Sequence, residues 1–450
     1  MLIQFSVKNF LSFKEQATLS MVASKRKSKD SQLDEGAVWS AFGDLQILKC
    51  AVIYGANNSG KSNLIKSLLF VKQLILDSSK ESRANEKIAV SPFLLNPDTE
   101  NEPSSFEIIF VQDRYLYQYE IAASSGRIES ERLSRKALKK SAVTVELFSR
   151  KQGSIEVGKG FSEGKGLENR TRANALFLSV CANFDGPISA AVTGWFAKIG
   201  IVSGLNDSAT LAWTASKLDD PELGDSIRQL LKMFDLGVDR FEPGEKIPGF
   251  KIESIETAAS TGGESPNVED SAVITSALTS LSRRPSRKVI SYHKMYTTAG
   301  DTVRDVAFDL TSNESAGTRK LVALAGPIVD ALKSARVLIV DEFESRLHSS
   351  ITSTILGIFN SQTGNPNGAQ LIAATHDTNL LSGENLRRDE IWFTGRDGSG
   401  STSLRSLVEY RVRNDASFEK NYLDGDYGGV PFLRPELAGL LTLPSRKSSK

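Results

Sequence analysis

The sequence has little of several features that would assign it to a specialised class of protein. Its 450 residues contain two cysteines, Cys50 and Cys181, so it offers no disulfide framework and suits a reducing compartment. No apolar run reaches the roughly 18–20 residues that a membrane span needs. The formal net charge is +1, so no overall field attracts the chain to nucleic acid or to a membrane. These absences predict a cytoplasmic globular protein without membrane contact.

The composition and the hydrophobic pattern predict a chain with a large core. Hydrophobic residues make up 40% and charged residues 24%, as in ordinary globular proteins, and the length admits one large domain or two to three smaller ones. Residues 1–25 predict strands at one edge of a sheet, and short alternating runs over 104–158 predict an antiparallel meander. Residues 170–285 carry apolar positions at helical spacing, interrupted by a polar segment at 256–272 that predicts a loop.

Residues 55–62, GANNSGKS, have the spacing G-x-x-x-x-G-K-S between an apolar strand and an amphipathic helix. The glycines let backbone N–H groups surround a phosphate, and the helix N-terminus adds partial positive charge. Lys61 is expected to neutralise the β- and γ-phosphates and Ser62 to bind Mg²⁺. A chance Gly/Ser turn would not explain the flanking strand and helix, so ATP or GTP binding is predicted. The expected nucleotide contacts are Gly55, Ala56, Asn57, Asn58, Ser59, Gly60, Lys61, Ser62 and Asn63.

Residues 337–348, VLIVDEFESRLH, place two adjacent acids directly after four apolar residues. Given a phosphate loop, this segment predicts a strand parallel to and beside the phosphate-loop strand, with Asp341 holding Mg²⁺ and Glu342 deprotonating the attacking water. Successive side chains of a strand point to opposite sides, so both acids reach the nucleotide only if the backbone turns there. The alternative is an exposed acidic loop, which a preceding buried run makes costly. Glu344 is expected to be solvated or in a structural pair.

A third motif, TSNESAGTRK, precedes the acidic strand. Ser315, Ala316 and Gly317 form S-x-G at the start of a predicted helix, whose N-terminus is a second candidate phosphate site. A capped helix start is the alternative for this short pattern alone. In the order phosphate loop, S-x-G and acidic strand, it resembles the signature motif of ABC-type ATPases, including SMC-like heads, which contacts the γ-phosphate bound to the other protomer. The basic side chains of Arg319 and Lys320 are expected to be solvated.

Two of the three histidines fall where this resemblance assigns a role. His376 follows an apolar run in LIAATHD, where ABC-type heads carry the switch histidine that contacts the γ-phosphate. His348 lies in SRLH just past Glu342 and matches the loop that crosses the dimer interface. His293, in SYHKMY, is expected to be a half-buried strand histidine.

Together these motifs resemble a prokaryotic family of ABC/SMC-like ATPases, the AAA family ATP-binding proteins that include the ATPase halves of RloA/AbiL-type and PARIS-type phage-defence systems. The opening MLIQFSVKNFLSF and residues 411–433 share the resemblance. It implies an α/β fold, an ABC-type (SMC/RecF-like) ATPase head with an antiparallel β subdomain and a helical insertion, without a long coiled coil. It also implies ATP and Mg²⁺ as cofactors, a homo-oligomer of heads that sandwich ATP, and a companion TOPRIM-like nuclease.

Four parts of the chain follow from the motifs and this resemblance. They are an N-lobe with the phosphate loop and meander at 1–165, a mainly helical insertion at 166–288, a C-lobe with the signature, acidic strand and switch histidine at 289–410, and a C-terminal segment with a disordered basic tail at 411–450. One family feature is missing, since no convincing Q-loop glutamine is found. The segment around Pro92 and Phe93 stands roughly where that loop belongs, and Gln112 is a poor substitute.

The predicted function is an ATP-hydrolysing switch, the ATPase or sensor subunit of an anti-phage system that controls a separate nuclease or toxin. Its hydrolysis is expected to be slow and gated by assembly. A self-contained OLD-type nuclease is less favoured, because Asp424 and Asp426 follow no apolar strand and too few residues follow His376 for a TOPRIM domain. A RecF-like DNA-binding ATPase of DNA repair is the other alternative, and the basic clusters at 132–140 and 283–288 leave DNA contact open.

Overall fold

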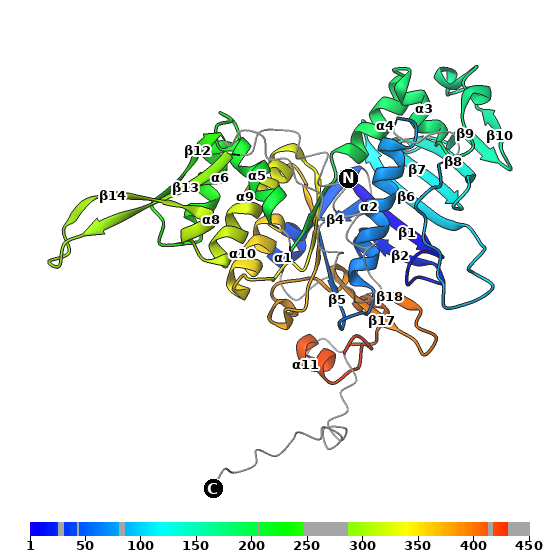
Figure 1. Cartoon of the computed structure of the whole chain (residues 1–450). Helices are drawn as coiled ribbons and strands as arrows, with labels where there is room; N and C mark the ends of the chain where they lie inside the picture. The colour runs from blue at the N-terminus through cyan, green and yellow to red at the C-terminus, as the bar shows by residue number, and fades with distance from the viewer. Residues whose placement is uncertain are drawn as a thin grey trace, which may run out of the picture.

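Two β-sheets and the helices packed on them form the body of the protein (Figure 1). The computed structural model describes residues 1–25, 31–42, 45–80, 86–205, 207–246, 287–412 and 417–430. Within these ranges, one sheet has seven strands in the order β10-β9-β8-β7-β6-β1-β2 and a second has six in the order β11-β15-β16-β5-β17-β18. A three-stranded sheet, β12-β13-β14, and a two-stranded one, β3-β4, complete the described part.

The seven-stranded sheet is antiparallel throughout and contains both the predicted meander and the predicted edge strands. Its strands are β1 (Leu2–Lys8), β2 (Ala17–Ser20), β6 (Ser104–Gln112), β7 (Tyr115–Ala123), β8 (Ile128–Ala137), β9 (Val145–Lys151) and β10 (Ser154–Val157). Alternate side chains are buried, as the period-two pattern predicts. The buried face packs against helices α3 (Phe177–Asn183) and α4 (Pro187–Ala197), where the rings of Phe110 and Trp195 stack with centroids 4.0 Å apart.

The six-stranded sheet carries the predicted motifs. Its strands are β5 (Cys50–Tyr54), β11 (Gly200–Ser203), β15 (Val337–Asp341), β16 (Gln370–Ala374), β17 (Ile391–Arg396) and β18 (Thr402–Ser406). All run parallel except β18, so their carboxyl ends meet at one edge. Every residue of β5 and β16 is buried, which is why these strands read as continuous apolar runs.

The prediction that the acidic strand lies directly beside the phosphate-loop strand was wrong. Strand β16 lies between β15 and β5 and pairs with both. The three strands are equally apolar, so the hydrophobic pattern could not reveal their lateral order. The carboxyl end of β16, which leads to His376, therefore lies between the phosphate loop and the acidic pair.

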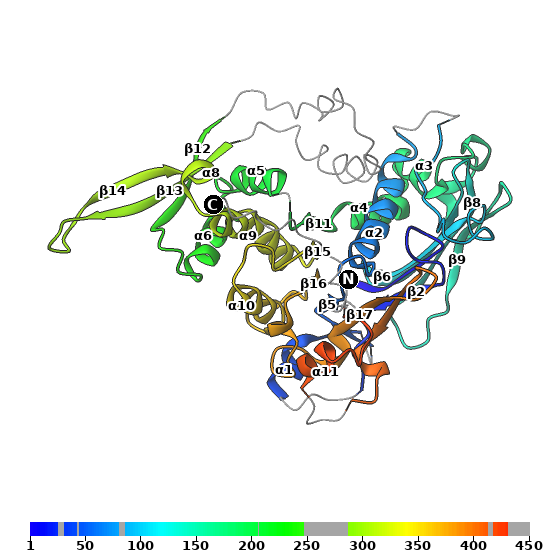
Figure 2. The ribbon, with the colours of Figure 1, turned by 60° about the horizontal axis from the view of Figure 1, so that its bottom comes forward.

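Helices cover both faces of the six-stranded sheet (Figures 1 and 2). They include α2 (Lys61–Asp77), α5 (Ser208–Lys217), α6 (Gly224–Lys232), α9 (Ala316–Ser334) and α10 (Ser349–Phe359). Shorter elements are α1 (Ser31–Ala37), β3 (Val38–Phe42), β4 (Leu45–Leu48), α8 (Leu310–Asn313) and α11 (Phe418–Leu423). The longest described helix, α9, has 19 residues, so the described ranges contain no long coiled coil. Among the described helices, none has the length and apolar character to cross a membrane.

A β-hairpin projects away from the body of the molecule (Figures 1 and 2). It consists of β13 (Arg287–Tyr296) and β14 (Thr302–Asp309), and only its inner half is flanked by β12 (Arg240–Lys246). Each residue over 294–305 is exposed. The chain leaves β14 through α8 and enters α9, so the hairpin connects directly to the predicted signature.

The range 166–288 is less separate than a helical insertion would be. It supplies α3, α4, α5 and α6, but it also supplies β11 to the six-stranded sheet and β12 to the hairpin sheet. The six-stranded sheet thus contains strands from each of the ranges 1–165, 166–288 and 289–410. The division of the chain into domains stays a prediction, and the predicted loop at 256–272 and tail beyond 430 lie outside the described residues.

Candidate functional site

The predicted phosphate loop connects β5 to α2, between a buried strand and a helix as expected. Gly60 immediately precedes α2 with φ 111°, a left-handed conformation that favours glycine. A side chain at Gly55 would overlap the side chains of Ser59 and Thr394, whose hydroxyl oxygens lie 2.6 Å apart. The close packing therefore explains why glycine occupies both ends of the loop.

Lys61 is folded back over the loop. Its Nζ donates hydrogen bonds to the carbonyl oxygens of Gly55, at 2.6 Å, and Ala56, at 3.1 Å. Burial lowers the pKa of Lys61 to about 8, and the carboxylates of Asp341, Glu344 and Glu342 oppose that shift in this order. A triphosphate would offer this buried ammonium stronger partners than two carbonyl oxygens.

The two predicted metal ligands lie together. Asp341 is the last residue of β15, and the Ser62 hydroxyl donates a hydrogen bond to its carboxylate. Burial raises the pKa of Asp341, a cost that a cation would relieve. Hydroxyl and carboxylate oxygens are the donors that Mg²⁺ prefers, so the pair fits that ion. No cluster of three or more His, Cys, Asp or Glu side chains suited to a metal occurs in the described ranges, so phosphate and water oxygens would complete its coordination.

The backbone turns at Glu342, as the two adjacent acids require. Glu342 has φ 48°, and its N–H donates to Asp341 Oδ1 at 3.1 Å. A side chain at Gly204, in the loop after β11, would overlap the carbonyl oxygens of both acids. Burial raises the pKa of Glu342, and the neighbouring carboxylates of Asp341 and Glu344 raise it further. A carboxylate with a raised pKa has the basicity that proton abstraction needs.

His376 and Glu344 are joined across neighbouring strand ends. The backbone N–H of His376 donates to Glu344 Oε1 at 2.8 Å, so Glu344 forms the structural contact that was one of its two expected states. The other oxygen, Oε2, is buried and has no hydrogen-bond partner among the described residues. Burial lowers the pKa of His376, and the Lys61 charge lowers it further, which favours a neutral imidazole. Glu344 thus orients the segment that carries the expected switch histidine.

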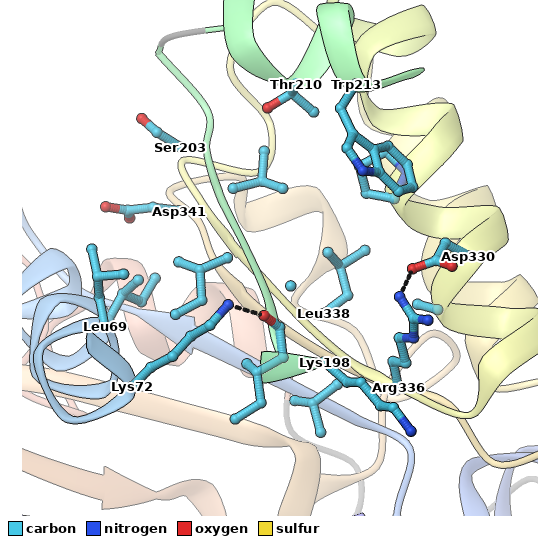
Figure 3. Close-up of a pocket in the computed structure, with 18 of the residues that line it drawn as sticks. Leu69, Lys72, Lys198, Ser203, Thr210, Trp213, Asp330, Arg336, Leu338 and Asp341 are labelled. Carbon is cyan, nitrogen blue, oxygen red and sulfur yellow. Dashed lines mark hydrogen bonds and ion pairs between the residues drawn. The ribbon is translucent and has the colours of Figure 1, made fainter. Parts of the chain in front are cut away.

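The strand and loop that flank Asp341 on its other side were not predicted from the sequence. Strand β11 pairs with β15, with Ser203 opposite Asp341. Figure 3 labels both residues at one end of a cavity of about 200 Å³, whose other end holds the Arg336–Asp330 ion pair. Ser203 therefore adjoins Asp341 within the sheet, whereas Pro92 and Phe93 belong to none of its strands. The strand itself, GIVS, has only two large apolar residues and lies within a stretch that was predicted to be helical.

The other two positions considered for the missing Q-loop do not adjoin the acidic pair in the strand order. The Phe93 ring is buried, and its backbone N–H donates to Asn9 Oδ1 at 3.0 Å. Gln112 is the last residue of β6 in the antiparallel sheet, where it pairs with Tyr115. Neither belongs to the six-stranded sheet.

The predicted signature lies at the start of α9. Ser315 caps the helix, because its Oγ accepts from the Thr318 N–H at 3.1 Å. A Cβ atom on Gly317 would lie 2.8 Å from the carbonyl oxygen of Arg346. No hydrogen bond between described residues joins 315–317 to 55–63. Within one copy, the signature therefore packs on the loop after the acidic pair.

The expectation that Lys320 is solvated was wrong. Its side chain is 0% exposed, and Nζ donates to the Gly204 carbonyl oxygen at 2.7 Å and lies 3.7 Å from Asp207 Oδ1. Arg346 contacts the second oxygen of the same carboxylate at 3.1 Å. Lys320 is buried because its face of α9 turns toward the β11 and β15 loops. This network ties the signature helix to the loops on either side of the acidic pair.

His348, predicted to lie in a dimer-interface loop, is exposed at the start of α10. Its Nδ1 accepts from the Ser350 N–H at 3.2 Å, so in one copy it caps the helix. His293 is half-buried on β13, where the sequence expected it. Its Nε2 lies 2.6 Å from Glu314 Oε1.

Comparison with known proteins places the chain in a family. Residues 50–382 match the family described as "AAA domain, putative AbiEii toxin, Type IV TA system". The chain belongs to this family. No curated protein matches it.

Several solved structures resemble this AAA-domain protein at low identity. The SMC head domain from Thermotoga maritima matches with 13% identity and a TM-score of 0.36, covering 90% of this chain and 98% of that one. A SmcHead bound to the C-winged helix domain of ScpA matches with 12% identity and a TM-score of 0.41, covering 90% of this chain and 97% of that one. The recombination mediator protein RecF-ATPrS matches with 14% identity and a TM-score of 0.33, covering 90% of this chain and 98% of that one. Matches at these TM-scores indicate no shared partner or activity. The family and the sheet described above establish an α/β, ABC/SMC-like ATPase fold with a nucleotide-binding function.

The pKa of Lys61 makes ATP affinity depend on pH. Below pH 8 the ammonium is charged before binding, whereas above pH 8 it must take up a proton when phosphates arrive. ATP affinity should therefore fall by about five- to tenfold between pH 7.5 and 9. Isothermal titration calorimetry at pH 8.5 in buffers of different ionisation enthalpy measures the proton uptake.

Lys72 offers a matched control, because burial also lowers its pKa to about 8 while its Nζ donates to the Ile199 carbonyl oxygen. Lys72→Met should keep the pH dependence of ATP binding. A constant ATP affinity over this range, with no proton uptake, would contradict the assigned contact of Lys61 with phosphate.

Lys320→Ala should lower the free energy of unfolding by about 2 kcal/mol, because it removes a buried charged hydrogen bond and leaves the Gly204 carbonyl oxygen unpaired. Urea unfolding measures this change. The neighbouring Arg319→Ala is the control, since Arg319 donates to Thr311 at the surface and should cost less than about 0.5 kcal/mol. Equal effects of the two substitutions would show that the Lys320 network does not hold the loops.

Proposed function

We propose that this protein is an ATP-driven switch in which each ATP is held between two copies of the chain. The phosphate loop and acidic pair of one copy would bind the nucleotide, and Ser315 and Gly317 of the other would contact its γ-phosphate. ATP then joins the heads and hydrolysis separates them. The head pair would act as the ATPase subunit of an anti-phage system and control a separate nuclease or toxin.

One observation supports the shared site most strongly. A single copy gathers Lys61, the Ser62–Asp341 pair and Glu342 at one edge of the six-stranded sheet. Its own signature packs instead on the Arg346 carbonyl oxygen and is not hydrogen-bonded to its phosphate loop. The capped start of a 19-residue helix thus remains available for an anion from another molecule.

The proposed hydrolysis uses groups with matching chemistry. Lys61 would bind the β- and γ-phosphates, and Ser62 with Asp341 would hold Mg²⁺, which neutralises phosphate charge when bound. The Glu342 carboxylate would accept a proton from the attacking water. The water oxygen bonds to the γ-phosphorus while the bond between the γ-phosphorus and the β-phosphate oxygen breaks, giving ADP and phosphate. A neutral His376 would donate a hydrogen bond to the γ-phosphate, held in place through Glu344.

The defence role rests on the family, whose description names a toxin and a toxin–antitoxin system. The alternatives receive less support from the structure. In the cluster at 132–140, Arg132 pairs with Glu120 and Arg135 covers the ring of Tyr115, so part of its charge is already used. Of the cluster at 283–288, the described members Arg287 and Lys288 are paired with acidic side chains.

The self-contained nuclease also receives little support. Asp424 and Asp426 lie in the turn that follows α11, and no strand leads into them. A D-x-D metal site of the predicted alternative requires a strand that ends at the acids. The turn interpretation therefore fits better, and we assign nucleic-acid cleavage to a companion protein.

Glu342→Gln should trap the pair of heads with ATP bound. The amide keeps the shape of the side chain but cannot accept the proton, so the ATP that joins the copies is not consumed. Mass photometry with ATP and Mg²⁺ should give twice the mass of the nucleotide-free variant. Adding Ser315→Arg to Glu342→Gln should restore the single mass while ATP still binds. Hydrolysis by Glu342→Gln at the wild-type rate would refute the assigned base, and an unchanged mass would refute the shared site.

The cellular role is tested separately. Cells that carry this gene with its neighbouring reading frames should plate phage at least tenfold less efficiently than cells carrying the same segment with Lys61→Ala. The substitution removes the charge that binds phosphate and leaves the companion proteins intact. Equal plating over a panel of phages would contradict a defence role, while the mass measurement above would still stand.

A further inference from the structure

The corner between β14 and α9 joins the projecting hairpin to the predicted signature. The chain passes from Asp309, the last residue of β14, through α8 and Glu314 to Ser315. Figures 1 and 2 both place β13 and β14 on the arm that extends from this corner. Only residues 310–314 connect the arm to Ser315, so a movement of the arm can displace the signature directly.

Glu314 is held by the opposite strand of the hairpin. Its Oε1 accepts hydrogen bonds from Ser291 Oγ at 2.5 Å and from His293 Nε2 at 2.6 Å. Ser291 and His293 are two residues apart on β13, so they present their side chains on the same face. Only 11% of the Glu314 side chain is exposed, which strengthens the two charge-assisted bonds. The residue before the signature serine is thus fixed to β13 rather than to the sheet below it.

Further contacts make the corner rigid. The Asp309 carboxylate accepts from the Thr311 and Ser312 N–H groups, which caps α8, and it also pairs with Lys288 of β13 at 3.0 Å. On the other side, Arg319 of α9 donates to the Thr311 carbonyl oxygen at 2.7 Å. A rigid corner transmits displacement of β13 instead of absorbing it.

The outer half of the hairpin, residues 294–305, does not take part in the contacts described above for the corner. Residues 294–305 are exposed on both faces, and Met295, Tyr296 and Val303 have 38%, 59% and 55% of their surface exposed. Ser291 and His293 lie before this stretch, so a shorter hairpin would hold Glu314 equally well. A two-stranded ribbon outside any core is only marginally stable alone, which makes it a lever that an outside contact can move.

We propose that Glu314 is a positioning residue that passes the position of the β13–β14 hairpin to Ser315, so that ATP-dependent pairing responds to whatever holds the hairpin. The inference rests on the proposed function, because Ser315 must contact ATP on a second copy. The inference adds a control of the shared ATP site by the position of the hairpin. The hairpin sets the signature in the paired or the unpaired geometry without contacting nucleotide itself.

Two pairs of substitutions separate the hydrogen bonds from the mere presence of side chains. Glu314→Ala removes the acceptor, whereas Glu314→Gln keeps an acceptor oxygen of the same reach. His293→Phe removes the donor but keeps a ring against Phe308, whose centroid lies 5.1 Å away, and His293→Gln restores a donor. The matched control is Asp305→Ala, which breaks an ion pair with Arg240 in the same sheet but touches nothing near Ser315.

The experiment introduces each substitution into the Glu342→Gln protein and measures two quantities. The first is the protein concentration at which half the molecules are paired with ATP, by sedimentation velocity. The second is the dissociation constant of ATP for the unpaired protein at nanomolar concentration. Glu314→Ala and His293→Phe should raise the pairing midpoint about tenfold, as expected if the competent signature of each of the two copies is populated about a third of the time. ATP binding should change less than about twofold, because the phosphate loop is untouched.

The conservative variants and the amides at the signature complete the test. Glu314→Gln, His293→Gln and Asp305→Ala should pair within about threefold of the parent, since an uncharged hydrogen bond still fixes the position. Hydrogen exchange of the amides over 315–318 should accelerate in Glu314→Ala before any nucleotide is added. A parent that never pairs with ATP would overturn the proposed function and this inference together. A parent that pairs, with Glu314→Ala pairing equally well or with unchanged exchange, would overturn this inference alone.

Discussion

The turn at Asp341 and Glu342 is the constraint on which the rest of the site depends. Two adjacent carboxylates serve one nucleotide only if the strand ends between them, and Glu342 adopts φ 48° to achieve this. Gly204 packs against the carbonyl oxygens of the two acids, where a side chain would overlap the turn, and Gly317 packs against the carbonyl oxygen of Arg346 in the loop that follows. The metal pair, the base and the signature therefore share one packed layer of backbone.

In the proposed function, this layer connects the ATP pocket of one copy to the signature that the same copy presents to its partner. Lys320 and Asp207 connect the signature helix to the loop after β11, and Arg346 connects the same carboxylate to the loop after the acids. In the proposed pair, a change at the acids of one copy would be mechanically linked to the signature that this copy presents to the other. The proposed role of Glu314 would add a third connection, from the hairpin, outside the nucleotide pocket.

Local motifs were predictable from the sequence, whereas their lateral arrangement was not. The phosphate loop, the turn after Asp341 and the helix start at Ser315 follow from residue types at fixed spacing, and the structure contains all three elements. The position of β16 between β15 and β5 has no local signature, because the buried strands of a parallel sheet look alike. The resulting place of His376 between phosphate loop and acids could not be derived either.

Residues whose role comes from long-range packing were missed or misjudged. Lys320 resembles any basic side chain early in a helix, and only the approach of Gly204 and Asp207, more than a hundred positions away, buries it. Ser203 ends a strand of four residues, which is too short for a periodic signal. Glu314 lies within the TSNESAGTRK motif but was assigned no role there, since its partners on β13 are defined only when the hairpin forms.

A mixing experiment tests most directly whether two copies share each ATP. Lys61→Ala cannot bind the phosphates and Ser315→Arg cannot complete the pocket of its partner, so each variant alone should have almost no ATPase activity. A mixed pair contains one pocket built from the intact phosphate loop of one variant and the intact signature of the other. An equal mixture should therefore recover about a quarter of the wild-type rate if copies pair at random. A mixture no more active than the sum of its parts, or full activity of Ser315→Arg alone, would contradict the account.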